Sequence, residues 1–252
     1  MKSAVRRVVF FAAILLVWSA LSRAHLWNAA VFPGPDQVFE NLADNLRNHT
    51  LLAAISVSMR RVAIGYLISL LLGVPLGIVL ARVPFLSDTV GSVVVGLQSL
   101  PSICWLPLAL LWFGLNDSAI LFVVVMGSFV SIAVAVEDGV RNLPPGYVRG
   151  ARTLGVSGLA LFTEVLLPAS LPAILTGAKL GWAYAWRALM AGELLFVSVG
   201  LGRMLMVGRD LGDMSQVIAV MIVIIAIGLF TDRVIFGNAE SLVRERFGLS
   251  RS

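Results

Sequence analysis

Three charged side chains, Lys179, Arg187 and Glu193, lie inside an apolar stretch that covers residues 174–197. A charge at the centre of a membrane-spanning helix costs roughly 2.5 to 3.5 kcal/mol, so residues of this kind usually carry a function there. At about 100° per residue, one sector of about 80° collects the large and charged side chains Lys179, Trp182, Trp186, Met190 and Glu193. A different side collects the small residues Gly177, Gly181, Ala185, Ala188 and Gly192. We therefore expect the small side to pack against other helices and the charged sector to face a wet space.

The large residues of this helix also have a structural interpretation. Trp182 and Trp186 can pack between helices or anchor the helix at the membrane interface instead of contacting a solute. Glu193 can hold Arg187 or Lys179 in place, although it lies about 120° from Arg187 on the helical wheel. We therefore expect a partner for Glu193 on another helix, or water, and assign this residue to a gate or a polar network and not to direct contact with a ligand.

Common motifs for ATP binding, metal binding and nucleophilic hydrolysis are missing from this sequence. No Gly-rich loop ends in Gly-Lys-Ser or Gly-Lys-Thr, so the chain itself cannot bind ATP in the P-loop manner. His25 and His49 are isolated, Cys104 is the single cysteine, and no Gly-x-Ser-x-Gly elbow occurs. We expect no catalytic residue, no metal and no cofactor in this chain. A component of a transport system accounts best for charges placed inside a membrane.

The composition is that of an integral membrane protein. Of 252 residues, 59% are hydrophobic and 13% are charged, and the mean hydropathy is +0.94, whereas soluble domains carry roughly 25% charged residues. The net charge of +5 does not indicate a nucleic-acid surface, because Lys and Arg stand in ones and twos at the ends of apolar runs. The sequence predicts an all-α, polytopic membrane protein that contacts membrane lipid and no nucleic acid.

Six apolar runs can cross about 30 Å of hydrocarbon as helices. The predicted spans cover residues 8–24, 62–81, 90–113, 118–136, 174–197 and 214–232 of a single transmembrane domain, residues 1–252. The first run follows Lys2, Arg6 and Arg7, so it can be a cleaved signal peptide or a retained span. We favour a retained span, because residues 19–24 read SALSRA and contain no clean small-x-small cleavage site.

The distribution of basic residues sets the orientation of these spans. Eleven Lys and Arg lie in the terminal segments and in the loops after the second and fourth spans, and six lie on the opposite side. The positive-inside rule then places both termini and the loop of residues 138–173 in the cytoplasm. Arg60 and Arg61 oppose this assignment, and we expect them to snorkel at the outer membrane face.

Small residues and prolines predict how two of the spans behave. Gly65, Gly73 and Gly77 let backbones approach, so the second span is expected inside a bundle. The long uncharged run of residues 89–116 is interrupted by polar residues and two prolines. One kinked helix fits this run, and Asn116 is expected to cap the fourth span.

The cytoplasmic loop of residues 138–173 is polar and rich in glycine. Pro145 and Gly146 are expected to open a short helix, Gly155 to end it in the left-handed conformation, and Ser157 to cap a second helix. The second helix has an apolar face, Leu159, Phe162 and Leu166, while Arg152 and Glu164 stay polar. The pattern predicts a helix, a bend and a helix, and we expect another protein to bind here.

The spacing across residues 149–168 is similar to the EAA-loop signature of inner-membrane permease subunits of bacterial ABC importers. The matching positions are Ala151, Gly155, Val165, Leu167 and Pro168, without a gap. Arg149 and Gly150 stand where the signature has its Glu and first Ala. The resemblance implies an ATPase-coupling loop with the residues Arg149, Ala151, Arg152, Leu154, Gly155, Ser157, Glu164 and Pro168. Arg149 and Arg152 have the alternative interpretation of ordinary positive-inside charges.

Residues 181–195, GWAYAWRALMAGELL, and the Gly-Leu-Gly at 200–202 look like the permease subgroup associated with nitrate, sulfonate, taurine and bicarbonate uptake. The resemblance implies the type I ABC importer permease fold, with six transmembrane helices in the cell inner membrane. It implies as partners a second permease copy in a homodimer, two cytoplasmic ATPases that bind ATP and Mg, and a periplasmic substrate-binding protein. We expect a small solute, such as the anions sulfonate, taurine or nitrate, to pass the predicted pathway residues Lys179, Trp182, Trp186 and Glu193.

Two other classes of protein remain as alternatives when the sequence alone is considered. An ion-gradient-driven secondary transporter or channel would normally show inverted repeats with paired broken helices, and we find no convincing internal repeat. A membrane scaffold or assembly factor would need neither charges within a span nor a bent loop. Copurification with an ATPase separates the importer from both alternatives.

Overall fold

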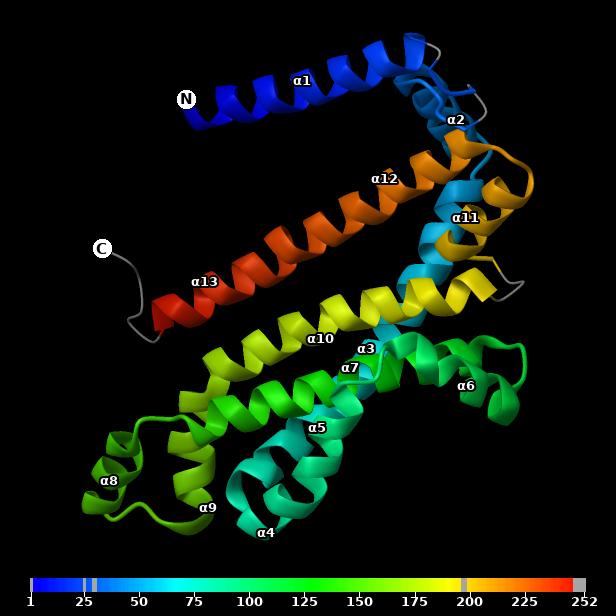
Figure 1. The fold of residues 1–252 in the computed structure, drawn as a ribbon. Helices are drawn as coiled ribbons and strands as arrows, with labels where there is room; N and C mark the ends of the chain where they lie inside the picture. Colours follow the sequence, from blue (N-terminus) through cyan, green and yellow to red (C-terminus); the bar gives the residue numbers. More distant parts are fainter. Residues whose placement is uncertain (1, 25, 29–30, 196–198, 247–252) are drawn as a thin grey trace. The chain divides into compact units, whose positions relative to one another are not determined.

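The computed structural model describes residues 2–24, 26–28, 31–195 and 199–246, and this part of the chain is helical and free of strands (Figure 1). The predicted all-α fold is therefore confirmed. The α-helices are α1 (Lys2–Arg23), α2 (Pro35–Arg47), α3 (Thr50–Arg82), α4 (Pro84–Leu86), α5 (Ser92–Gln98), α6 (Leu106–Phe113), α7 (Asp117–Arg141), α8 (Pro145–Thr153), α9 (Gly158–Ala160), α10 (Leu167–Leu195), α11 (Leu201–Asp210), α12 (Met214–Phe230) and α13 (Gly237–Arg246). The π-helical segments Ser87–Gly91, Leu161–Leu166 and Thr231–Phe236 and the 3₁₀ turn Ser102–Trp105 join some of them.

Four helical stretches of the described chain are long and apolar enough to cross a membrane, namely Thr50–Arg82, Asp117–Arg141, Leu161–Leu195 and Met214–Val243. They contain the second, fourth, fifth and sixth predicted spans, except that residues 196 and 197 lie outside the described residues. They extend beyond the predicted limits because helical hydrogen bonds continue past the charged residues at which an apolar run ends. The first predicted span corresponds to α1, whose apolar part is the shorter stretch Val8–Arg23.

The third predicted span is bent more sharply than the expected kink. The stretches Pro84–Gln98 and Ser102–Phe113 pass the same test only together, and they meet at 102°. Pro101 has no N–H to donate and adopts φ −54° and ψ 136°, which ends the helix. The Cys104 N–H then donates a hydrogen bond to the Pro101 carbonyl at 2.9 Å, and this bond starts the 3₁₀ turn.

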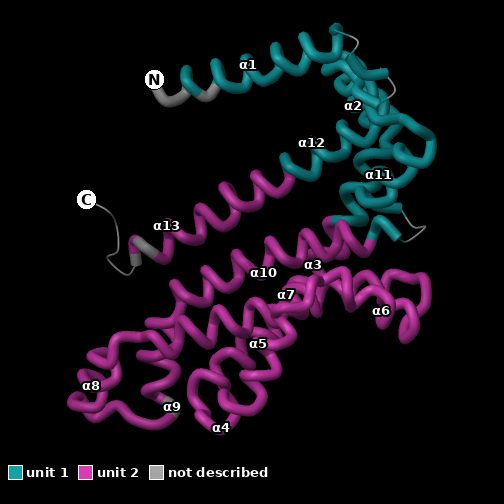
Figure 2. Tube along the Cα trace, in the orientation of Figure 1, with its two compact units in different colours: residues 1–58, 193–226 teal, residues 59–192, 227–252 magenta. Residues whose placement is uncertain are grey.

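The chain divides into two compact units, residues 1–58 with 193–226 and residues 59–192 with 227–252 (Figure 2). In the second unit, α7 is packed closely against α3 and α10 at glycines. A Cβ at Gly77 of α3 would lie 2.4 Å from the Ala133 carbonyl oxygen, and one at Gly181 of α10 would lie 2.3 Å from Ile132 Cγ1. The predicted packing of α3 and of the small-residue side of α10 is confirmed, because only a missing side chain permits this approach.

Local capping and apolar burial explain how α7 becomes the packed centre of that unit. The Asn116 side chain accepts hydrogen bonds from the N–H groups of Ser118 at 2.9 Å and Ala119 at 3.3 Å, so the predicted cap is confirmed. The helix then buries a row of apolar side chains completely, namely Ala119, Ile120, Val123, Val124, Ile132, Ala133 and Val136. In a membrane-spanning helix such burial stabilises the bundle through close van der Waals packing.

In the first unit, side-chain hydrogen bonds tie the short helices together. Trp18 Nε1 donates to the Pro33 carbonyl at 3.0 Å, where the chain turns from α1 into α2. Asn41 of α2 donates to Asp213 at 3.1 Å, just before α12. Gln216 of α12 donates to the Met204 carbonyl of α11 at 2.9 Å. The chain between the first two predicted spans thus forms a short helix, α2, which is anchored by polar contacts.

Candidate functional site

A Schellman turn ends α8 in the predicted coupling loop. The Val156 N–H donates to the Ala151 carbonyl at 3.0 Å, and the Gly155 N–H donates to the Arg152 carbonyl at 3.0 Å, which is the pair of bonds that defines this turn. Gly155 has φ +81°, and a Cβ on it would meet nothing within 4 Å. The prediction of a left-handed glycine is confirmed, and the reason is backbone conformation and not lack of space.

The inner side of this loop is a small apolar core. Ala151, Leu161 and Leu166 are buried together, and the side chains packed against them are Leu143, Val148, Val156, Phe162 and Val165. Residues on both sides of the bend contribute, so the core holds α8 against the segment that leads into α10. The apolar face expected for the second helix is present at Phe162 and Leu166, whereas the side chain of Leu159 lies outside the described residues.

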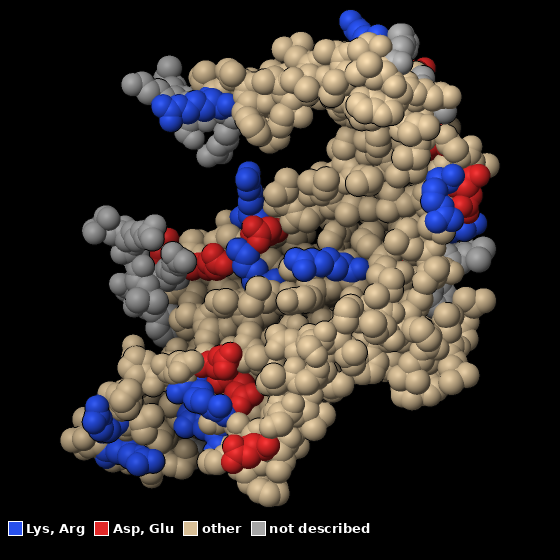
Figure 3. Space-filling view, viewed as in Figure 1, with Lys and Arg blue, Asp and Glu red and all other residues tan. Residues whose placement is uncertain are grey.

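The outer side of the loop exposes large side chains. Tyr147 is 52% exposed and Leu154 is 83% exposed, and Arg149 and Arg152 are exposed as well. Figure 3 shows Lys and Arg side chains on the part of the surface that α8 forms. An exposed Leu flanked by an aromatic ring and arginines is a composition suited to binding a protein surface.

The second half of the loop differs from the expectation in its geometry. Ser157 occupies the predicted cap position with extended backbone, but its side chain makes no capping hydrogen bond. Gly158 has φ +58°, a second left-handed residue that the sequence reasoning missed. The helix is π-helical over Leu161–Leu166, with Glu164 exposed, and it continues without a break into α10, of which Pro168 is the second residue.

At the end of α10, the carboxylate of Glu193 is only 1% exposed and is bound by protein groups. The Ser58 hydroxyl lies 2.8 Å from Oε1 and 2.7 Å from Oε2, and the Gly202 N–H donates to Oε2 at 3.0 Å. The Leu201 N–H donates to the Ser58 hydroxyl at 2.9 Å. The expected polar network around Glu193 therefore exists, and Ser58, a serine within an apolar helix, is a member that the sequence reasoning missed.

The Gly-Leu-Gly of residues 200–202 surrounds this carboxylate at the start of α11. A Cβ on Gly200 would lie 2.6 Å from the Glu193 carboxylate, and one on Gly202 would lie 2.5 Å from Glu193 Cβ. The negative side chain thus sits at the positive end of a helix, an arrangement worth about 0.3 to 1 kcal/mol when exposed and up to about 2 kcal/mol when partly buried. Both glycines are needed for space.

The other predicted pathway residues form a separate cluster in the second unit. Lys179 lies 3.1 Å from Asp232 and 3.2 Å from Glu240, so its charge is paired. Trp182 meets the Tyr66 ring edge-on at 5.3 Å between centroids and stacks on Trp186 at 6.5 Å. These contacts support the structural interpretation of both tryptophans. A role of Lys179, Trp182, Trp186 and Glu193 in transport stays a prediction.

Two further ion pairs lie at opposite ends of α7, and one corrects an expectation. Arg61 does not snorkel, because it is 3% exposed and its guanidinium lies 2.6 Å from Asp117 at the start of α7. The expectation was wrong since α3 carries Arg61 on the side that packs, which charge counting cannot reveal. At the other end, Glu137 lies 2.6 Å from Arg141 and accepts a hydrogen bond from Ser87 at 3.1 Å, directly before the coupling loop.

The sequence matches known transport proteins over most of its length. The family described as "Binding-protein-dependent transport system inner membrane component" matches residues 73–236. A putative ABC transporter permease protein of Methanocaldococcus jannaschii is 32% identical, with 92% of this chain and 88% of that protein aligned. The nitrate import permease protein NrtB of Leptolyngbya laminosa is 32% identical over 75% and 68% of the two chains. The taurine transport system permease protein TauC of Escherichia coli is 28% identical over 77% and 72%.

A solved structure shares the fold. The structure titled "Inward facing conformations of the MetNI methionine ABC transporter" contains a chain that superposes with a TM-score of 0.65. The alignment covers 80% of this chain and 97% of that one, at 19% sequence identity. At this identity the likeness concerns the fold and not the ligand.

Proposed function

Because the chain belongs to the family of inner membrane components of binding-protein-dependent transport systems, we propose that this ABC importer permease carries a small anion that a periplasmic binding protein delivers. The observation that supports the importer mechanism best is the loop of residues 138–173, in which Gly155 ends α8, with its apolar core inside and exposed side chains outside. Such a loop can dock in a groove of an ATPase and transmit force.

The loop is suited to this task because it is stiff. Its Schellman turn and its apolar core keep α8 in one orientation to the start of α10, so a push on α8 reaches a membrane-spanning helix. Two cytoplasmic ATPase subunits, which bind ATP and Mg, supply the push, and a second copy of this chain completes the pathway. ATP binding by the partners then shifts the equilibrium between inward-open and outward-open states.

The proposal of an anion is supported by two relatives with similar sequence identity to this chain, which are named for the import of nitrate and of taurine. Nitrate and taurine differ in size and shape, but both carry a negatively charged group of oxygens. The relatives named for their import are 32% and 28% identical to this chain. An oxyanion is the chemistry that the two names share, so we propose this class as the solute.

The orientation follows from the distribution of Lys and Arg. Both termini and the loop of residues 138–173 are cytoplasmic in this proposal, which places the loop on the side where ATP is available. The described α2 and α11 then belong to the periplasmic side, where the binding protein docks. The protein is a multi-pass component of the inner membrane.

The test is coexpression of the permease with its candidate ATPase and purification through a tag on the ATPase. Leu154→Glu places a charge in the centre of the proposed docking surface, and we expect at least a tenfold loss of permease recovered with the ATPase. The matched control is Leu211→Glu, since Leu211 is 75% exposed but lies before α12. Equal recovery of the two variants would contradict docking at this loop.

A second measurement addresses the solute. Proteoliposomes that contain the complex and the binding protein should import nitrate or taurine only when ATP is enclosed with the ATPase. Import that follows an ion gradient without ATP would contradict the proposal.

A further inference from the structure

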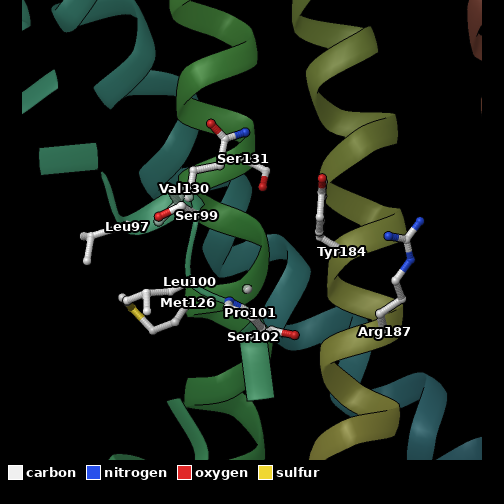
Figure 4. Close-up of a pocket in the computed structure, with 12 residues that line it drawn as sticks. Leu97, Ser99, Leu100, Pro101, Ser102, Met126, Val130, Ser131, Tyr184 and Arg187 are labelled. Atoms are coloured by element: carbon white, nitrogen blue, oxygen red, sulfur yellow. The ribbon is translucent and has the colours of Figure 1, made fainter. Parts of the chain in front are cut away.

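A cavity in the unit of residues 59–192 and 227–252 is lined by none of the four predicted pathway residues. It has a volume of about 260 Å³ and is formed by the break after α5, by α7 and by α10 (Figure 4). Its polar lining side chains include Gln98, Ser102, Ser131, Tyr184 and Arg187. Figure 4 shows the oxygens of Ser102 and Ser131 on the side of α7 that faces α10.

Arg187 gives this cavity a positive charge. No Asp or Glu lines the cavity, and among the described residues no carboxylate forms an ion pair with Arg187. Its guanidinium carbon lies 5.4 Å from the centroid of the Tyr184 ring, a cation–π contact that leaves the N–H donors available. Two other basic residues of the membrane-spanning helices, Arg61 and Lys179, each form ion pairs with carboxylates. Within the described part of the chain, the charge of Arg187 is therefore not balanced by a carboxylate.

The neighbouring polar groups are unused as well. Within the described part of the chain, no hydrogen bond involves the side chains of Gln98, Ser102, Ser131 or Tyr184. Three hydroxyls and one amide therefore face a positively charged cavity without protein partners. Convergent polar groups of this kind are what orients a ligand in a pocket.

The broken helix adds its backbone to the same cavity. The 3₁₀ turn that continues into α6 starts at Ser102, which lines the cavity, so the start of this turn lies beside it. Such a start carries a partial positive charge, and broken helices of transporters direct it at anionic solutes. Gly127 of α7 allows this position, since a Cβ there would lie 3.1 Å from Ser102 Cβ.

We propose that this cavity binds the transported oxyanion, with the Arg187 guanidinium as its main partner and the hydroxyls of Ser102, Ser131 and Tyr184 as further donors. The inference rests on the proposed import of a small anion. Arginine presents two parallel N–H donors to a planar or tetrahedral oxyanion. The cavity is slightly smaller than the roughly 300 to 1,000 Å³ of sites for drug-sized ligands, which suits a nitrate or a sulfonate group.

The test measures equilibrium binding to the complete permease–ATPase complex in phosphatidylcholine nanodiscs, without the binding protein. The probes are radiolabelled nitrate and taurine, with urea as a neutral, planar probe. The variants are Arg187→Gln, which removes the charge, Arg187→Lys, which keeps it without the paired donors, and Ser131→Ala. The matched control is Arg209→Gln, since Arg209 is an exposed arginine outside the cavity.

We expect Arg187→Gln to weaken binding of at least one anion at least tenfold, the loss expected for one charged hydrogen-bond partner. Arg187→Lys and Ser131→Ala should weaken it less, Arg209→Gln should leave it unchanged, and urea should not bind. Wild-type affinity in Arg187→Gln, or no binding of either anion by the wild type, would overturn the proposal.

A lipid headgroup phosphate shares the chemistry of an oxyanion, so a second arm adds phosphatidylglycerol to the nanodiscs. We expect the affinity for the anion to stay the same. Competition by phosphatidylglycerol, together with native mass spectrometry showing lipid retained by the wild type and lost from Arg187→Gln, would overturn the proposal. Assembly of each permease variant with the ATPase is measured as well, because it separates a failure of this inference from a failure of the importer mechanism. A wild type that fails to assemble with the ATPase contradicts the importer mechanism, whereas assembled complexes that bind the anions equally well contradict only the cavity.

Discussion

Gly77 in the packed centre of the membrane domain and Gly155 in the coupling loop are both required, but for opposite reasons. Gly77 lies in the middle of α3, and a Cβ on it would lie 2.4 Å from the Ala133 carbonyl oxygen. Gly155 has open space around it but adopts φ +81°. One glycine is needed because two backbones touch and the other because the chain must bend. Some substitutions add a side chain that needs room, and others add one that disfavours positive φ. Comparing the two kinds of substitution therefore tests the two regions independently.

The largest effect is expected at the packed region. Gly77→Leu should prevent α3 from lying against α7, because the side chain would overlap a backbone carbonyl that cannot move alone. We expect most of the folded permease to be lost, measured as monodisperse protein by fluorescence-detected size exclusion after solubilisation. The matched control is Gly96→Leu in α5, where a Cβ meets nothing within 4 Å. Similar losses for both variants would show that packing against α7 is not the reason.

The next effect is expected at the loop, where folding should survive and coupling should not. Gly155→Val forces a β-branched residue into the left-handed region, at a cost on the order of 1 to 3 kcal/mol. The Schellman turn should open, and ATP-dependent uptake in vesicles should fall at least tenfold with normal amounts of permease in the membrane.

Gly155→Asn is the variant that sharpens this contrast. Asparagine tolerates positive φ better than other residues with a Cβ, so this variant should keep most of the uptake. At Gly77 asparagine should fail, because the requirement there is space. Normal uptake by Gly155→Val would sink the assignment of the loop as the coupling element.

A smaller effect on uptake is expected from substitutions that compare the two sides of α10. Glu193→Gln keeps the shape of the side chain but weakens its bonds to Ser58 and Gly202, each worth about 1.5 to 3 kcal/mol when a charge takes part. We expect assembly with the ATPase to persist and the uptake rate to change severalfold. Ala188→Ser on the packing side is the control, and uptake should stay near that of the wild type. Normal transport by Glu193→Gln with loss in Ala188→Ser would reverse the assignment of the two sides.

The smallest effect on function is expected from a labelling variant. Ser157→Cys in a Cys104→Ser background should transport normally, because the Ser157 side chain makes no capping hydrogen bond. A membrane-impermeant thiol reagent should label it in inside-out vesicles and not in intact spheroplasts. Labelling from the outside would invert the orientation of the loop and of both termini.

Features with a local cause could be predicted from the sequence. The left-handed end of α8, the Asn116 cap of α7 and the glycine-rich side of α10 each depend on a few neighbouring residues. Apolar runs likewise located the spans, since about twenty residues of any helix cross the hydrocarbon. The limits of the spans could not be predicted in the same way, because a helix can continue past the charged residues that bound an apolar run. Helix α3, for example, includes Arg60 and Arg61.

By itself, the sequence determined the class of the protein, its spans and its bent loop, because hydrophobicity, glycine conformation and capping act over short distances along the chain. The tertiary structure decided which charges are satisfied. Arg61 meets Asp117 and Glu193 meets Ser58, partners 56 and 135 residues apart, while Arg187 faces a cavity instead. These pairings depend on how each helix is rotated about its own axis, and that rotation is set by packing between residues far apart in the sequence, such as Gly77 and Gly181 against α7.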